Sequence, residues 1–269
     1  MENYTFYLIL AAGIFIGLAA FVVRQTLRNR QLERLLDDTN AKLEQIQVQF
    51  ERFAPQEVIE HLTESNGKYA ARMRTVTVLF ADLKGFTKMC DQMDPSEVLP
   101  ILNGYFLCMS EALSNHHGQV TELTGDGLLA LFGALRPNPW QVQDAVMGAL
   151  AMRKALMGYN EELRSQSLPE LSFGIGIHQG EVLAGVIGNV ELRKFGVVGD
   201  TINVAARVES LTRVHHVDLL VTGVVRNKLD ERFSVRCMSP VPVKGKQDLL
   251  VTYYVKGLKT DTSIQKSLK

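Results

Sequence analysis

The sequence is short of cysteine and has no excess of charge of either sign. Its 269 residues include three cysteines, Cys90, Cys108 and Cys237, which stand far apart and form no metal-ligand or redox motif. Such spacing favours reduced thiols in a cytosolic fold over a disulfide framework. Twenty-nine basic residues balance twenty-nine acidic ones, so the charge gives no support to nucleic-acid binding. No internal repeat or low-complexity segment is present, and the length suits one good-sized domain with appendages.

One uncharged run, Thr5–Val23, stands near the N-terminus. A helix of that length rises about 28 Å, which is enough to cross the hydrocarbon core of a bilayer. Arg24, Arg28 and Arg30 follow it, so the positive-inside rule predicts an outside N-terminus and a cytoplasmic remainder. A cleaved signal peptide is the alternative, but there is no basic first region and the run is long for one. We therefore expect residues 1–24 to be a single-pass transmembrane signal anchor in the plasma or inner membrane.

Residues 25–54 carry many charges and a seam of mostly apolar residues in alternating steps of four and three. The seam positions are Leu32, Leu36, Thr39, Leu43, Ile46, Phe50 and Phe53. This spacing predicts a parallel coiled coil, and a single amphipathic helix packed on the domain is the alternative. Pro55 ends the segment, and residues 55–71 are predicted to hold a short coupling helix. After it we expect one globular domain over residues 72–258 and a polar tail over residues 259–269.

Strands and helices follow one another irregularly from Arg72 to about Gly257. Val76, Val78 and Phe80 have the period of a buried strand, which ends at Asp82. Other expected elements are helices over residues 94–114, 140–164 and 201–211, the last capped by Asp200, and strands within 119–132 and over 171–178, 181–188, 219–222 and 252–255. Because helices and strands do not alternate strictly, the pattern predicts an α+β sheet with helices on one face.

The stretch Thr75–Thr87 places a carboxylate, Asp82, at the end of its strand. Gly85 then breaks the strand ahead of a helix, where free backbone N–H groups can bind phosphates. A carboxylate at such a junction can also hold a metal ion. For this segment alone, a strand-end aspartate that caps the next helix is an equally good interpretation.

A second carboxylate, Asp126, stands in the glycine-flanked turn of the segment Glu122–Gly133. Two acids from separate strand ends, each beside a turn that exposes backbone, suit a pair of Mg²⁺ ions that hold a triphosphate. Alone, Gly-Asp-Gly is only a tight turn between strands. The adjacent pairs His116–His117 and His215–His216 are interpreted as surface residues of loops and not as metal ligands.

Taken together, five segments resemble the class III nucleotidyl cyclases. They are FADLKGFT at 80–87, the GD turn at 125–126, GIGIHQGEVLAGVIG at 174–188, VVGDTINVAARVE at 197–209 and VKGK at 243–246. Their order and spacing match the family over roughly residues 72–257. The resemblance implies an α+β fold, the ferredoxin-like class III cyclase catalytic domain. It also implies an enzyme that forms a cyclic nucleotide and pyrophosphate from a purine nucleoside triphosphate.

The resemblance assigns roles to individual residues. Asp82 and Asp126 match the metal-binding aspartates, with the Leu83 carbonyl as a further ligand, and two Mg²⁺ or Mn²⁺ ions per site are implied. Asn203 and Arg207, four apart on one helix face, match the pair that orients the ribose and stabilises charge in the transition state. The residues implied to bind phosphates are Gly85, Phe86 and Thr87, through backbone N–H groups, and Lys244, through its ammonium group.

The family's active sites lie at the interface of a head-to-tail dimer. The metal-binding aspartates of one subunit work there with the Asn, Arg and Lys of the other. The resemblance therefore implies a homodimer in which a monomer holds no complete site. The predicted coiled coil would raise the effective concentration of the two catalytic domains and set their relative angle.

Two positions, Glu122 and Gly196, are implied to select the purine base. Similar adenylate cyclases carry Lys at the first and Asp or Thr at the second, where animal guanylate cyclases carry Cys. A carboxylate can accept hydrogen bonds from N1–H and N2–H₂ of guanine together, whereas adenine offers it only a bare acceptor. Beside adenine the Glu122 charge would stay unpaired, which would disfavour ATP about a hundredfold relative to GTP. The residues therefore favour GTP and 3′,5′-cyclic GMP, while Gly196 provides no donor to guanine O6.

Other interpretations of these residues stay open. ATP, with cyclic AMP as the product, is the alternative substrate, and a salt bridge from Glu122 to Lys194 would make Glu122 purely structural. A pseudo-cyclase that only binds nucleotide is disfavoured, because such a protein usually loses some of the matched residues. A metal-dependent hydrolase could use two aspartates, but it has no need of the Asn-x-x-x-Arg helix.

Overall fold

The computed structural model describes residues 24–25, 28–30, 42, 71–188, 193–242 and 249–259. The chain separates into two compact units, Met1–Gln56 and Glu57–Lys269. All strands and helices named below belong to the second unit. The predicted anchor, most of the predicted coiled coil, the coupling helix, Lys244 and the tail beyond residue 259 lie outside the described residues.

The predicted single-pass membrane localisation is contradicted by the structure. Across the described ranges, no helix is both long enough and apolar enough to cross a bilayer. The longest of them, Gln141–Ser165, carries charged side chains such as Arg153, Lys154 and Glu161 along its length. Charges of this kind are costly in a hydrocarbon core. The run Thr5–Val23, on which the prediction depended, is outside the described residues.

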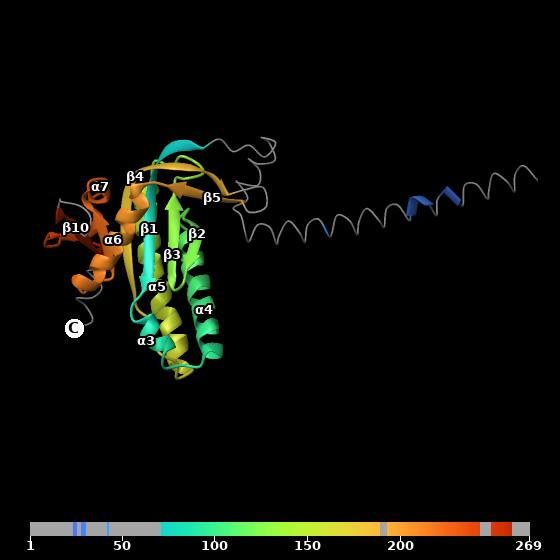
Figure 1. Cartoon of the computed structure of the whole chain (residues 1–269), viewed down its shortest axis with the longest axis horizontal. Coiled ribbons are helices and arrows are strands. Elements are labelled where there is room, and N and C mark those ends of the chain that lie inside the picture. The colour runs from blue at the N-terminus through green and yellow to red at the C-terminus, as the bar shows by residue number, and fades with distance from the viewer. Residues whose placement is uncertain are drawn as a thin grey trace, which may run out of the picture. The chain divides into compact units, whose positions relative to one another are not determined.

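One mixed sheet forms the centre of the second unit (Figure 1). Its strands are β1 (Arg72–Leu83), β2 (Gln119–Thr124), β3 (Gly127–Phe132), β4 (Phe173–Gly188), β5 (Arg193–Val198), β6 (Leu219–Thr222), β7 (Phe233–Cys237) and β10 (Thr252–Leu258). They lie in the order β2-β3-β1-β4-β6-β10-β7, and β5 pairs with β4. The pairing of β4 with β6 is parallel, and the other pairings within this sheet are antiparallel. Two short strands, β8 (Val241–Pro242) and β9 (Leu249–Leu250), form a separate ribbon.

The described helices of this unit are α3 (Phe86–Cys90), α4 (Pro95–Ser114), α5 (Gln141–Ser165), α6 (Asp200–Val214) and α7 (Gly223–Arg226). Asp94 caps α4 by accepting a hydrogen bond from the Ser96 N–H at 2.8 Å, and Pro95 occupies the first turn. The chain order β1-α4-β2-β3-α5-β4 over a sheet order of β2-β3-β1-β4 is the ferredoxin-like arrangement. The predicted fold class of this domain is therefore confirmed.

Helices cover both faces of the sheet, and the prediction of helices on one face was wrong. Along β1, Leu79 and Ala81 pack in one apolar cluster with α4 and α5, while Val76 and Val78 pack in another with Ala205 of α6. Figure 1 shows α4 and α5 together on one side of the sheet and α6 on the other. The polar Thr77 between Val76 and Val78 gave β1 a period of two, which is typical of one covered face, although Thr77 is itself fully buried.

The strand β4 is continuous over sixteen residues, although two separate strands were predicted there. Its pairing with β1 runs without interruption from Phe173 to Ala184. Gly180 is a point of close approach and not a break, since a Cβ there would lie 2.6 Å from the Thr201 Oγ1. Asp200 is the first residue of α6 and not its cap; Gly199 takes the cap position. Strands β5 and β7 were not predicted.

Gly176 on β4 marks the tightest packing of α6 on the sheet. A Cβ at this position would overlap the backbone nitrogen of Glu209 and the carbonyl oxygen of Ala205. Because backbone atoms can yield only if the whole helix moves, we expect Gly176→Ala to lower the free energy of unfolding by about 1–3 kcal/mol. Urea denaturation followed by circular dichroism would measure this change.

A matched control for that substitution is Gly158→Ala in the exposed part of α5, where a Cβ would meet nothing within 4 Å. Alanine is the better helix former, so the control should raise stability by up to about 1 kcal/mol. Equal stability of the two variants would contradict the tight packing of α6.

Candidate active site

Asp82 is the penultimate residue of β1, and its carboxylate is partly exposed. Its register partner on β4 is Gly174. On the other side lies Gly127, the first residue of β3, where a Cβ would come within 3.1 Å of the Asp82 Oδ1. The carboxylate therefore packs directly against the turn between β2 and β3 while remaining within reach of solvent.

Asp126 occupies that turn, directly after Gly125, whose φ of +63° suits glycine. The pairing of Ala81 with Leu128 sets the end of β1 beside the start of β3, which brings Asp126 next to Asp82. Burial raises the pKa of Asp126, and the nearby Asp82 carboxylate raises it further. The two acids, which are distant in the sequence, thus meet at one end of the sheet.

A divalent cation suits this pair of carboxylates, because two like charges at close range repel unless a cation or a proton lies between them. Across the described residues no group of three or more His, Cys, Asp or Glu side chains is arranged to hold a metal ion. The two aspartates and the Leu83 carbonyl would therefore need ligands from elsewhere. Mg²⁺ is commonly held in this way, by one or two carboxylates together with water and substrate phosphates. The donor set fits Mg²⁺ or Mn²⁺.

Arg213 on α6 contacts the same groups, although the sequence did not identify it as a site residue. Its Nη2 donates to the Asp82 Oδ2 at 2.5 Å and to the Leu83 carbonyl oxygen at 3.4 Å. Its Nη1 donates to both carboxylate oxygens of Glu209, at 3.2 and 3.3 Å. Glu209 is only 3% exposed, and burial raises its pKa to about 7 although Arg213 acts to lower it. The four-residue spacing of this pair on a helix was the available sequence signal.

Tyr105 of α4 is a second residue that the sequence did not identify. It is fully buried, and its hydroxyl has no hydrogen-bond partner within the described part of the chain. Burial raises the pKa of Tyr105, and the charges of Asp82 and Asp126 raise it further. The hydroxyl therefore stays protonated and is a spare donor close to the two acids. The sequence placed this residue only within the predicted helix over residues 94–114.

The predicted phosphate-binding segment comes directly after these acids. Gly85 adopts a left-handed conformation with φ of +74° and is the cap residue of α3. Phe86 is half-buried, and Thr87 is exposed in the first turn. The first N–H groups of a helix have no acceptor within it, so they are available to an anion.

Asn203 and Arg207 lie on α6, but on another side of the helix from Arg213. Asn203 is exposed and Arg207 is half-buried. At about 100° per residue, Arg207 points roughly 160° away from Glu209 and roughly 120° away from Arg213. Since Glu209 and Arg213 form the side that faces Asp82, the structure does not bring Asn203 and Arg207 to the acids of their own chain.

Glu122 and Gly196 lie on two different strands, β2 at the edge of the sheet and β5, which pairs with β4. Glu122 is exposed on β2 opposite Leu129, next to a shift in register. Leu129 belongs to the apolar cluster that also contains Phe195 and Val197, the neighbours of Gly196 on β5, so Gly196 itself faces away from that cluster. A Cβ on Gly196 would come within 2.9 Å of the flexible end of the Ile187 side chain.

Both the sequence and the fold of this chain resemble known nucleotide cyclases. Residues 68–257 match the family of adenylate and guanylate cyclase catalytic domains. The adenylate cyclase of Anabaena cylindrica is 36% identical over 227 residues, which cover 80% of this chain and 44% of that protein. Adenylate cyclase 1 of Rhizobium meliloti (strain 1021) is 30% identical over 211 residues, which cover 78% of this chain and 32% of that protein. The chain thus spans less than half the length of these two relatives.

Solved structures give the same picture of the fold. The guanylyl cyclase Cya2 is similar with a TM-score of 0.63 and 32% identity, over 70% of this chain and 94% of that one. The adenylyl cyclase CyaB from P. aeruginosa has a TM-score of 0.66 over 71% and 98% of the two chains. At 23% identity this second likeness concerns the fold alone.

Proposed function

This chain belongs to the family of class III adenylate and guanylate cyclase catalytic domains, and from that premise we propose that it is a homodimeric guanylate cyclase. It would convert GTP into 3′,5′-cyclic GMP and pyrophosphate. In this reaction the ribose 3′-oxygen forms a bond to the α-phosphorus and its proton is lost to solvent. The bond from the α-phosphorus to the oxygen that bridges to the β-phosphate breaks, and pyrophosphate leaves.

The observation that carries the proposal is the meeting of Asp82 and Asp126 at the end of β1. Bound divalent metal ions would supply Lewis-acid stabilisation of the triphosphate and of the attacking oxygen. Asp82, Asp126 and the Leu83 carbonyl would hold them. With its Oδ2 bound by Arg213, Asp82 turns Oδ1 toward the Asp126 turn. Gly85, Phe86 and Thr87 would orient the phosphates through their N–H groups, and Lys244 would bind them from the other subunit.

The direction of Asn203 and Arg207 on α6 supports the proposed homodimer. These side chains turn away from the acids of their own chain, so they can act only on a substrate held by a second copy. In that copy's site, Asn203 would orient the ribose and Arg207 would meet the charge that grows on the α-phosphoryl oxygens. A parallel coiled coil over residues 25–54 would hold the two copies together.

GTP is the proposed substrate because of the carboxylate at position 122. Glu122 can accept both Watson–Crick-edge donors of guanine, and Gly196 offers no side-chain acceptor to the 6-amino group of adenine. ATP remains the second candidate, and the names of the Anabaena cylindrica and Rhizobium meliloti relatives favour it. Those names belong to longer proteins, whereas the argument from Glu122 concerns a residue of this chain.

The test is cyclic nucleotide formation by the purified full chain from GTP and from ATP separately, in Mg²⁺ and in Mn²⁺. We expect GTP to be preferred, and we expect Glu122→Lys to lower kcat/KM for GTP about a hundredfold because it replaces two acceptors by donors. Glu231→Lys makes the same charge change in an exposed residue before β7, at the opposite edge of the sheet from β2, and should have no effect.

Two outcomes of this assay would contradict the proposal in different ways. Preference for ATP by the unmodified chain, or an unchanged GTP preference in Glu122→Lys, would overturn the role of Glu122 and leave the cyclase chemistry intact. Absence of product from both nucleotides would favour a protein that only binds nucleotide.

A further inference from the structure

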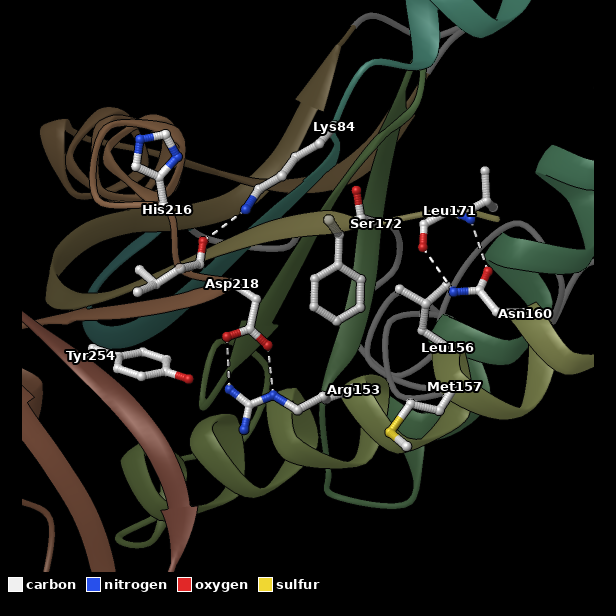
Figure 2. Close-up of a pocket in the computed structure, with 12 residues that line it drawn as sticks. Lys84, Arg153, Leu156, Met157, Asn160, Leu171, Ser172, His216, Asp218 and Tyr254 are labelled. Atoms are coloured by element: carbon white, nitrogen blue, oxygen red, sulfur yellow. Dashed lines mark hydrogen bonds and ion pairs between the residues drawn. The ribbon is translucent and has the colours of Figure 1, made fainter. Parts of the chain in front are cut away.

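A second site is suggested by a cavity of about 490 Å³ on the α5 side of the end of β1 (Figure 2). Its walls come from α5, the start of β4, the loop after α6 and strand β10. Lys84 reaches it from the segment between β1 and α3. None of the residues assigned to metal or nucleotide lines this cavity. Its size is within the usual range of sites for small organic ligands.

One wall of the cavity is polar and carries an excess positive charge. The Lys84 Nζ donates to the Val217 carbonyl oxygen at 2.7 Å, which fixes the ammonium group at the wall. Arg153 and Asp218 neutralise each other through two hydrogen bonds of 2.6 and 2.9 Å. The Lys84 side chain is half-buried at this wall, so an added anion would offset the cost of removing water from its ammonium group.

The opposite wall is apolar and held in shape. Leu156, Leu171 and Phe173 are buried core residues that line it. Asn160 clamps the backbone of Leu171 with two hydrogen bonds of 2.8 Å, one to the carbonyl oxygen and one from the N–H. Figure 2 shows Leu156, Leu171 and Met157 across the cavity from Lys84 and the Arg153–Asp218 pair. The apolar wall is therefore preformed, which lowers the entropic cost of binding.

We propose that this cavity binds a small organic anion, with its acidic group on Lys84 and its apolar body against Leu156, Leu171 and Phe173. A nucleoside triphosphate does not suit it, because Lys84 is the one lysine or arginine among the described lining residues that no ion pair neutralises. A purely apolar ligand would leave the ammonium group without compensation. A molecule with one acid and one ring or short chain satisfies both walls.

The position of Lys84 would link this ligand to catalysis. Lys84 lies between Leu83 and Gly85, that is, between the proposed metal-binding carbonyl and the proposed phosphate-binding segment. Its backbone N–H donates to the Ser172 carbonyl oxygen at 2.7 Å, so it also ties that segment to the start of β4. An anion on Lys84 would thus contact the active-site segment without entering the active site.

The probe for this site is 8-anilinonaphthalene-1-sulfonate, an aromatic monoanion that fluoresces in apolar surroundings. Titration of the full chain should give saturable binding with one dye per chain, unaffected by saturating GTP. Lys84→Met keeps the length of the side chain but removes the charge-assisted hydrogen bond, and should raise the dye Kd about 10–100-fold. Lys154→Met removes an exposed charge from α5 outside the cavity and is the matched control.

A second variant covers the case in which Lys84→Met fails to fold. Met157 is 65% exposed at the cavity, so Met157→Glu leaves the core untouched while placing a like charge near the anion. It should also weaken dye binding, by about tenfold or more. The proposal is overturned if binding is not saturable, if GTP displaces the dye competitively, or if Lys154→Met weakens binding as much as the cavity variants do.

Discussion

Arg207→Ala is expected to lower kcat for cyclic nucleotide formation by about 10²–10³, the usual effect of removing a charged donor from a transition state. Arg207 is half-buried on α6 and turned away from the acids of its own chain. Its absence should therefore leave Mn²⁺ binding and folding nearly unchanged. Steady-state kinetics at saturating nucleotide, with Mn²⁺ affinity measured by electron paramagnetic resonance, would separate the two effects.

The control for this substitution is Arg226→Ala, in the last turn of α7, which removes the same side chain from a helix outside the proposed site. It should keep kcat within about twofold of the unmodified protein. A loss of less than tenfold in Arg207→Ala would remove Arg207 from the transition state. An equal loss in both variants would indicate a general effect of charge.

The variants Asp126→Asn and Arg207→Ala are each expected to be nearly inactive alone. A mixed dimer with one subunit of each variant is expected to be active. Asn keeps the shape of the turn but loses the charge that a divalent cation needs. In a two-fold symmetric homodimer, random mixing makes half of all dimers mixed. Each mixed dimer has one site with both substitutions and one with neither, so about one quarter of the unmodified activity should return in the whole mixture and about one half in the isolated mixed dimers. Co-expression with two different affinity tags, followed by tandem purification, would isolate the mixed dimers.

The discriminating control pairs Asp126→Asn with Asp82→Asn. Each site takes both of its aspartates from one subunit. In a mixed dimer one site therefore carries Asp126→Asn and the other carries Asp82→Asn, so both sites stay defective. No activity should return from this pair. Recovery here, or failure of the Asp126→Asn and Arg207→Ala pair, would show that the sites are not shared between subunits in the proposed way.

Much of this protein follows from local sequence. The period of Val76, Val78 and Phe80 marked β1, and the glycines around Asp126 marked the turn between β2 and β3, because backbone preferences act between close neighbours in the chain. The motifs that resemble class III cyclases pointed to the family to which the chain belongs, and to the two acids that meet at the end of β1.

Errors arose where a local pattern had more than one meaning. Gln179 and Gly180 looked like a break between strands, but pairing with β1 carries β4 through them. The apolar run Thr5–Val23 predicted a membrane protein, whereas no helix among the described residues can span a bilayer. The covering of both sheet faces was hidden because the polar Thr77, which stands between Val76 and Val78 and suggested a solvent-facing side, is itself fully buried.

Tertiary packing alone decided the surroundings of the two acids. The hydrogen bond from Arg213 to Asp82 joins residues 131 positions apart. It exists because Gly174 and Gly176, which have no Cβ, let α6 settle against β4. The same packing turns Glu209 and Arg213 toward Asp82 and turns Asn203 and Arg207 away from it. Such contacts depend on how elements dock, and no interaction between neighbours along the chain encodes them.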